Sequence, residues 1–418
     1  SAAHGAGVRE CGVRGVRRES RGGGAPVGGA VHMGLWGRGP PRTGQLRQHQ
    51  QPSHQRRPRR VGAHVAHRAT AIALGKKDGE AGKKERMGRS AVPAGRYYER
   101  YQGHPMPLLS RVHDEMRRVE GEGNDGAKAE QDGGERPTIF LAGDSTLDNK
   151  HWLFPYYDQS AACFLGDVKR KTFTATAVNG FDRVLQPPAM VQDVTFWLNH
   201  ELAERDSKYF ALNTSVEAST LTERVGGCQL CCVPTCGHLL PQDEYIRDNI
   251  TEKDVLLVSM GGNDVALAPS IFTALFMFLM MITPWFLLFP CHPAIMYFLY
   301  LFRVNGVRYI KKVTSVTMPH KIGVCMLYNL DEANVSSWAN ATLGCLCYSC
   351  FPSMLQYRIN LIYRYGISRI KLRGTTIVPI RLCEALDGKD TQDYCERVEP
   401  SIIGGRKMAR LILEKLKL

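Results

Sequence analysis

The 418-residue sequence predicts an α/β fold: a three-layer α/β/α domain on a flavodoxin-like, parallel, five-stranded sheet. Short, continuously apolar segments alternate with segments of helical periodicity, as in parallel sheets covered by helices on both faces. Three of the apolar segments also end in polar loops. Ligands of such sheets bind beyond the carboxyl ends of the strands, so these loops predict a site at that edge.

The expected strands are the apolar runs at 139–142, 209–212, 255–260, 322–328 and 375–380. Residues 189–202 and 354–370 show helical spacing and are predicted to form helices. Ser401 stands before a last segment with a regular apolar side, where its hydroxyl is placed to cap a helix.

Residues 1–136 are expected to form a disordered, basic, low-complexity tail before a folded domain at 137–418. The first 100 residues carry 21 Lys and Arg against 6 Asp and Glu, so the rest of the chain is nearly neutral despite a total charge of +14. Segments such as QHQQPSHQRRPRR have no apolar periodicity and cannot offset the entropy of ordering. The tail has too few aromatic residues to favour RNA binding, and no nucleic-acid partner is expected for the folded domain.

The chain opens with Ser1 rather than Met. Residues 1–86 are therefore also interpreted as upstream sequence translated in frame. Met33, Met87 and Met106 are the candidate starts.

Three polar blocks follow the first three strands. They are Gly143-Asp144-Ser145-Thr146, the loop at 213–220 (NTSVEAST) and Gly261-Gly262-Asn263-Asp264. In this order, and with the closing EPSIIGGRKMA, they resemble the signature blocks of the SGNH (GDSL-type) hydrolase and esterase superfamily, over about 137–416. The segments LLPQDEYIRDN, VCMLYNLDEA and LDGKDTQDY further resemble a eukaryotic branch of that superfamily.

The resemblance implies that Ser145 is the nucleophile and that three groups stabilise the oxyanion formed on its attack. Two of these groups are the Ser145 N–H and the Asn263 side chain. The third is a glycine N–H in the family, and that position aligns with Ala218, whose methyl group crowds a close approach. An alternative block, 178–181 (VNGF), keeps a glycine but has no clear strand before it.

The sequence departs from the family at the catalytic base. The family ends in Asp-x-x-His-Pro, whereas this chain has Glu396-Arg397-Val398-Glu399-Pro400. Glu396 aligns with the supporting acid and Glu399 replaces the histidine. A carboxylate of ordinary pKa, about 4.3, matches proton abstraction at neutral pH less well than imidazole, although burial can raise it.

Three interpretations of this departure stay open: Glu399 is the base, a histidine from elsewhere replaces it, or the protein is inactive. The histidines considered are His151, His238, His292 and His320. His151 lies at the expected end of the sheet, and His320 at the wrong end.

The predicted function is a serine esterase or lipase-like hydrolase acting on a small-molecule ester of a lipid or acylated compound, through an acyl-Ser145 intermediate. The alternatives are an inactive binding protein on the same fold and an acyltransferase.

Residues 265–302 contain no Asp, Glu, Lys or Arg. The segment is interpreted as an interfacial element or lid in contact with a membrane surface, as ordinary buried helices, or as a membrane hairpin.

The thirteen cysteines do not form a short secreted framework, and no secretory signal is visible, which favours a cytoplasmic or membrane-associated location. Two cysteine groups, at 228–238 and 345–350, have spacings that zinc could use. Reduced loop cysteines are the preferred interpretation, and no cofactor is expected.

Overall fold

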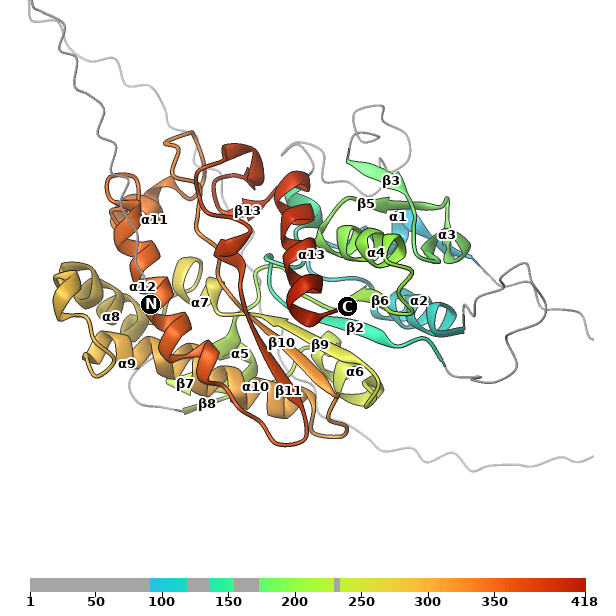
Figure 1. Ribbon diagram of the computed structural model, residues 1–418, viewed down its shortest axis with the longest axis horizontal. Coiled ribbons are helices and arrows are strands. Elements are labelled where there is room, and N and C mark those ends of the chain that lie inside the picture. Colours follow the sequence, from blue (N-terminus) through green and yellow to red (C-terminus); the bar gives the residue numbers. More distant parts are fainter. Residues whose placement is uncertain (1–90, 119–134, 154–172, 229–233) are drawn as a thin grey trace, which may run out of the picture. The chain divides into compact units, whose positions relative to one another are not determined.

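The computed structural model describes residues 91–118, 135–153, 173–228 and 234–418. Its central sheet has five parallel strands in the order β11-β10-β9-β2-β6 (Figure 1). They are β2 (Thr138–Gly143), β6 (Phe210–Asn213), β9 (Val255–Ser259), β10 (Lys321–Met326) and β11 (Thr376–Arg381). All residues of β2, β6 and β9 are buried, as in strands covered on both faces. The predicted α/β class and five-stranded parallel sheet are confirmed.

Helices α4 (Val194–Glu204) and α13 (Ile402–Leu416) pack together on one face of the sheet. Each begins at a side-chain cap: the Asp193 carboxylate accepts from the Phe196 N–H at 2.8 Å, and the Ser401 hydroxyl accepts from the Gly404 N–H at 3.1 Å, as predicted for Ser401. The helix predicted at 189–202 begins only at Val194, because residues 189–191 form a strand instead.

The other face carries α2 (Met106–Arg118), α5 (Leu221–Val225), α6 (Pro241–Asn249) and α10 (Gly306–Val313), as right-handed crossovers require. A buried ion pair joins three of them: Arg224 Nε lies 2.7 Å from an Asp243 oxygen, and the Tyr309 hydroxyl donates to the same carboxylate at 2.6 Å. A buried charge needs such partners.

The folded part begins earlier than the predicted boundary at 137. Strand β1 (Val92–Pro93) pairs with β4 (Leu185–Gln186), and it is followed by α1 (Ala94–Tyr97) and α2. Helix α2 buries Leu109, Val112 and Met116. This apolar side is short and follows a polar, basic stretch, so its periodicity is easily overlooked. Residues 1–90 lie outside the described part of the chain.

The segment between β9 and β10 is helical: α7 (Gly262–Ala266), α8 (Ile271–Ile282), η4 (Trp285–Leu287), α9 (Pro293–Leu299) and η5 (Tyr300–Asn305). Between β10 and β11 lie α11 (Asn340–Cys345) and α12 (Pro352–Tyr365). Figure 1 shows α8 and α9 at the left of the view beside α12. Helix α12 ends before Gly366, earlier than predicted.

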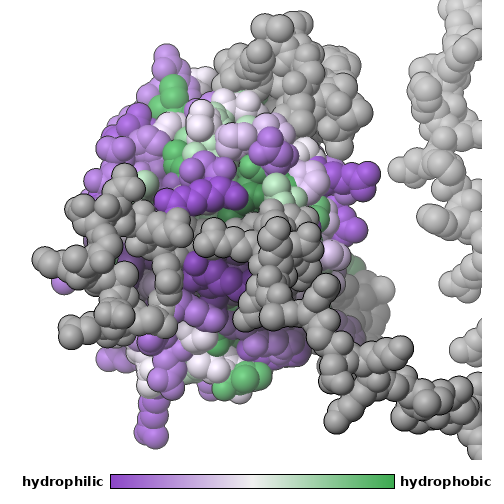
Figure 2. Space-filling model, turned by 90° about the vertical axis from the view of Figure 1, so that its right-hand side faces the viewer, coloured by the Kyte–Doolittle hydropathy of each residue, from purple (hydrophilic) through white to green (hydrophobic). Residues whose placement is uncertain are grey.

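Most of the exposed large hydrophobic side chains in the described residues lie between 267 and 304, so these helices are not the ordinary buried helices of one interpretation. The face seen in Figure 2, on the opposite side from α8, is mainly hydrophilic where it is described. Across the described ranges, no helix has both the length and the apolar character needed to cross a membrane.

The remaining elements are short. They are η1 (Lys150–Leu153), β3 (Thr174–Thr176), α3 (Phe181–Val184), β5 (Ala189–Val191), β7 (Gly226–Cys228), β8 (Pro234–Cys236), η6 (Ile367–Arg369), η7 (Leu382–Glu384), η8 (Thr391–Asp393), β12 (Tyr394–Cys395) and β13 (Glu399–Pro400).

The attachment of α2 to the sheet can be tested at Asp254. Its buried carboxylate accepts from Arg117 and from the Thr138 N–H of β2, both at 2.7 Å. Asp254→Ala removes both bonds, and we expect urea unfolding of the full chain to show a loss of about 2–4 kcal/mol. Glu135→Ala removes the exposed partner of Arg117 and should cost less than about 0.5 kcal/mol. An equal loss of stability in Asp254→Ala and Glu135→Ala would contradict the assignment of α2 to the folded domain.

Candidate active site

The three polar loops predicted from the sequence meet at the carboxyl edge of the sheet. The Val216 N–H donates to the Gly143 carbonyl at 3.0 Å, which joins the second loop to the first. The Asn263 amide donates to the Ser219 carbonyl at 3.0 Å, which joins the third loop to the second. These bonds bring Ser145, Ala218 and Asn263 into one region.

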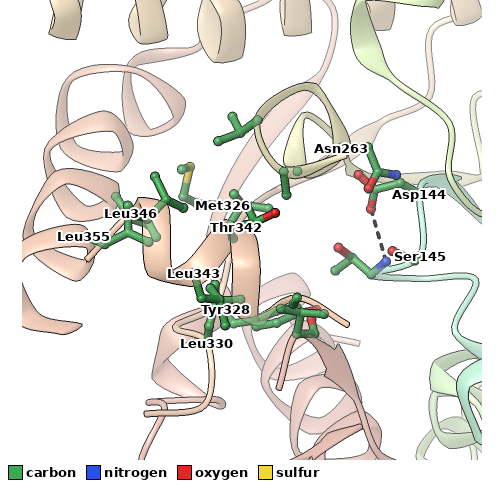
Figure 3. Close-up of a pocket in the computed structure, with 18 of the residues that line it drawn as sticks. Asp144, Ser145, Asn263, Met326, Tyr328, Leu330, Thr342, Leu343, Leu346 and Leu355 are labelled. Carbon is green, nitrogen blue, oxygen red and sulfur yellow. Dashed lines mark hydrogen bonds between the residues drawn. The ribbon is translucent and has the colours of Figure 1, made fainter. Parts of the chain in front are cut away.

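Ser145 lies in a tight turn at the end of β2 and is 7% exposed. The Asp144 carboxylate accepts from the Thr146 N–H at 3.1 Å (Figure 3). The Asp144 backbone carbonyl accepts from the N–H groups of Leu147 and Asp148 at 3.0 Å. Within the described residues, the Ser145 N–H has no acceptor. The turn therefore leaves that donor available to a ligand oxygen.

Ala218 has a φ of 60°, in the left-handed region that favours glycine. This geometry suits the position where the family has glycine, and the Ala218 N–H also has no acceptor among the described residues. The alternative block at 178–181 is at the wrong edge of the sheet. Arg136, just before β2, donates to the Asn179 carbonyl at 3.1 Å, so that block lies at the amino ends of the strands.

Asn263 belongs to α7, and Gly261, the residue before this helix, has a φ of 101°. The neighbouring Asp264 accepts from the backbone N–H groups of Leu221 and Thr222 at 2.6 and 2.9 Å. This carboxylate fixes the start of α5 to α7 and holds Asn263 near the second loop.

Glu399 comes to the site on the short β12–β13 hairpin, where it pairs with Cys395. The Glu399 and Ser145 side chains line the same cavity. Burial raises the pKa of Glu399 well above its usual value, the Glu217 charge raises it further, and the nearby Ser145 side chain lowers it. The predicted nucleophile and the predicted base thus lie in one cavity.

The hairpin turn uses two non-glycine residues with positive φ, Glu396 at 49° and Arg397 at 66°. The buried Arg397 guanidinium stabilises this turn by donating to Asn340 at 2.7 Å and to the Asp331 carbonyl at 3.1 Å. The position of Glu399 therefore depends on the contacts of Arg397.

The expected support of Glu399 by Glu396 does not occur. Glu396 is exposed, and its carboxylate accepts from the Trp338 N–H at 3.3 Å. The turn directs this side chain outward. A second carboxylate here would also have repelled the negative charge of the base rather than oriented it.

Glu217 is a buried site residue that the sequence analysis missed. One of its oxygens accepts from the Trp152 indole at 3.1 Å and from the Tyr101 hydroxyl at 3.3 Å, while the other has no partner. Burial and the charge of Asp148 raise the pKa of Glu217 to about 8. Glu399 also has one unpartnered buried oxygen, and the charge of Glu217 raises its pKa, so the ionisation of each carboxyl affects the other.

Two polar residues shortly after Ser145 connect its loop to the second loop and to the β12–β13 hairpin. They are Asp148 and Asn149. Asp148 accepts from the Asn213 side chain and from the Glu217 N–H, both at 3.1 Å, and its charge is paired with Lys150. Asn149 donates to the carbonyl of Pro400, next to Glu399, at 2.9 Å. The run of three polar residues after GDSTL was the one sequence signal for this role.

None of the four histidines considered lines the cavity at Ser145. The His151 ring bonds the Arg100 carbonyl at 2.7 Å, and burial lowers its pKa. His320 lies at the amino end of β10, His292 caps α9, and His238 is exposed. A histidine base is therefore not found in the described part of the chain.

The cavity has one polar end and a long apolar wall (Figure 3). Asp144, Ser145, Asn263 and Glu399 form the polar end. The wall comes from the segment between β9 and β10, from the loop after β10, and from α11 and α12. It includes Met280, Phe298, Phe302, Met326, Leu343, Leu346, Leu355 and Ile359.

Cys345, Cys347 and Cys350 are free and exposed. Part of the other cysteine group, at 229–233, lies outside the described residues. Among the residues that are described, no three His, Cys, Asp or Glu side chains are grouped to hold a metal ion.

Neither a family model nor a curated protein matches the chain. Solved structures that match include a lipase from a goat rumen metagenome (11% identity, TM-score 0.37), covering 67% of this chain and 97% of that one. They also include phospholipase A1 from Streptomyces albidoflavus (11%, 0.35, covering 68% and 100%). A putative SGNH hydrolase from Slackia heliotrinireducens matches similarly (9%, 0.33, covering 68% and 100%). With its own sheet order and motif loops placed as the sequence resemblance implies, this chain has an SGNH hydrolase fold.

The raised pKa of Glu217 predicts a pH-dependent stability. A carboxyl with a raised folded pKa stabilises the fold fully below its unfolded pKa, about 4.3, and loses this contribution as the pH rises through the folded value, about 8. Glu217→Gln cannot ionise, so we expect its free energy of unfolding to exceed that of the wild type by about 2–4 kcal/mol at pH 9, with little difference at pH 4.

Glu396→Gln, which changes an exposed carboxylate, should show no such pH dependence in the same urea titrations. A constant difference between Glu217→Gln and the wild type across this range would contradict the raised pKa.

Proposed function

We propose that the protein is a serine ester hydrolase whose general base is Glu399, acting on an ester with an apolar acyl group. The observation that carries this proposal is that Ser145 and the buried Glu399 share the polar end of an apolar cavity. A nucleophile beside a carboxyl whose pKa is raised by burial is an arrangement that general-base catalysis can use.

In the first step the Ser145 oxygen attacks the ester carbonyl carbon, and its proton passes to Glu399. The negative oxygen that forms would be stabilised by the N–H groups of Ser145 and Ala218 and by the Asn263 amide. Collapse of this intermediate breaks the ester C–O bond, and Glu399 returns the proton to the leaving alkoxide. The product is an acyl-Ser145 ester and a free alcohol.

In the second step a water molecule attacks the acyl-Ser145 carbonyl and gives its proton to Glu399. The acyl–oxygen bond to Ser145 breaks, and Glu399 returns the proton to the serine. The acid is released and the enzyme is regenerated, with no net change in protons on the protein.

The apolar wall supports the choice of substrate class. Met326, Leu343 and Leu355 lie opposite Ser145 and Asn263 in the cavity (Figure 3). These side chains would bury an alkyl chain, and they offer no hydrogen-bond partner to a polar acyl group.

Labelling by a fluorophosphonate probe and hydrolysis of short- and long-chain nitrophenyl esters test this proposal. We expect Ser145→Ala to abolish labelling and turnover. Glu399→Gln keeps the shape but cannot accept the proton, so turnover should fall by about 10²- to 10⁴-fold. Glu396→Gln is the matched control and should keep wild-type turnover.

No labelling of folded full-length protein would overturn the hydrolase and leave the inactive binding protein. Acyl transfer to an added alcohol in preference to water would instead identify an acyltransferase.

The pH profile of kcat/KM tests the carboxyl pair. Only ionised Glu399 can act as base, so activity should fall on acidification with an apparent pKa above the usual value for glutamate. The Glu217 charge is one cause of that rise, so Glu217→Gln should move the acid limb to lower pH. An unchanged limb in Glu217→Gln would show that the two carboxyls are not coupled.

A further inference from the structure

The helices between β9 and β10 expose an apolar surface, here called the insert surface. Its members are large hydrophobic side chains that are 42–65% exposed: Ile271, Leu275, Phe278, Ile282, Trp285, Phe286, Leu287, Phe289, Met296 and Tyr300. The first four recur along α8 at the spacing of one helix face. A helix face in contact with water normally carries charged residues, but 265–302 has none.

The insert surface is held in place by buried polar contacts. The Arg358 guanidinium of α12 donates to the carbonyls of Met280 and Thr283 at 3.0 and 3.3 Å, at the end of α8. The hydroxyls of Thr273 and Tyr297 lie 2.7 Å apart and join α8 to α9. The exposed face of α8 is therefore a fixed platform rather than a loose lid.

The charges beside the insert surface have one sign. From 265 to 330 the chain has no Asp or Glu, whereas it has five Lys or Arg. Two of these, Arg303 and Arg308, are exposed and follow directly after the surface. Arg308 donates to the Tyr300 hydroxyl at 2.7 Å and lies 5.4 Å from the centre of its ring.

We propose that the insert surface docks on a phospholipid bilayer with anionic headgroups. Apolar side chains flanked by arginines complement both parts of such a surface, the acyl region and the negatively charged headgroups. Trp285 and Tyr300 have the apolar ring and polar atom that suit the boundary between these parts. The chain lies on the bilayer in this arrangement and does not cross it.

The insert surface is also connected to the cavity. Met280 of α8 and Phe298 of α9 line the cavity wall, while other residues of the same helices are exposed. An acyl chain leaving the bilayer would thus meet apolar side chains from the surface to Ser145. This role in substrate supply rests on the proposed function, whereas docking itself does not.

Vesicle flotation of the full chain, in its Ser145→Ala form, tests docking without any catalysis. The vesicles contain phosphatidylcholine alone or phosphatidylcholine with phosphatidylserine. We expect flotation with the anionic vesicles, and a fall in partitioning of at least about tenfold in the double variant Phe278→Ser, Phe286→Ser. Val316→Ser, exposed but outside the insert surface, is the matched control and should float like its parent.

The basic tail also attracts anionic vesicles, but it is the same in every form, so differences between variants at one ionic strength report on the insert surface. Arg303→Gln with Arg308→Gln should weaken binding to the anionic vesicles and leave binding to phosphatidylcholine unchanged. Flotation that the double phenylalanine variant does not reduce would overturn the proposal. So would a lipid-free dimer that this variant dissociates, because a second copy would then cover the surface.

Discussion

The geometry of the site depends on one buried carboxylate, Asp148. It has no exposed surface and accepts hydrogen bonds from the Asn213 side chain and from the N–H groups of Gly103 and Glu217, while Lys150 neutralises it. A buried charge is costly unless every lone pair finds a donor, so the three segments around Gly103, Asp148 and Asn213 must take fixed positions together. Asn149 extends the same constraint to the carbonyl next to Glu399. The loop after β2 therefore carries the nucleophile and also positions the groups around it.

This arrangement concentrates negative charge in a dry region. Burial raises the pKa of Asp144 to about 6 and that of Glu217 to about 8, and it raises the pKa of Glu399 as well. A glutamate in place of histidine would be too weak a base in water. Among neighbouring carboxyls and apolar side chains, its proton affinity rises. Under the proposed mechanism, these surroundings compensate for the missing histidine.

The sequence predicted the sheet and the three loops because apolar strands and short motifs are local signals. It did not predict Glu217, Asp148 or Asn149 as site residues, since their partners are distant in the chain; Asn149 and Pro400 are 251 positions apart. Glu396 was assigned by spacing alone, and spacing does not reveal a turn with two positive φ angles. The sequence did not predict the elements around α2, because the apolar side of this helix is short and follows a long polar stretch.

The glutamate base and the apolar segment between β9 and β10 are physically linked. Glu399 keeps a raised pKa only while the cavity excludes water, and residues such as Met280, Phe298 and Phe302 supply the wall that does so. An apolar acyl chain in the cavity would complete this exclusion, so the proton affinity of the base would be highest when such a substrate is bound. A polar substrate would bring water with it and lower that affinity. Under the proposed mechanism, a glutamate base would therefore favour esters that the apolar wall of the cavity can hold.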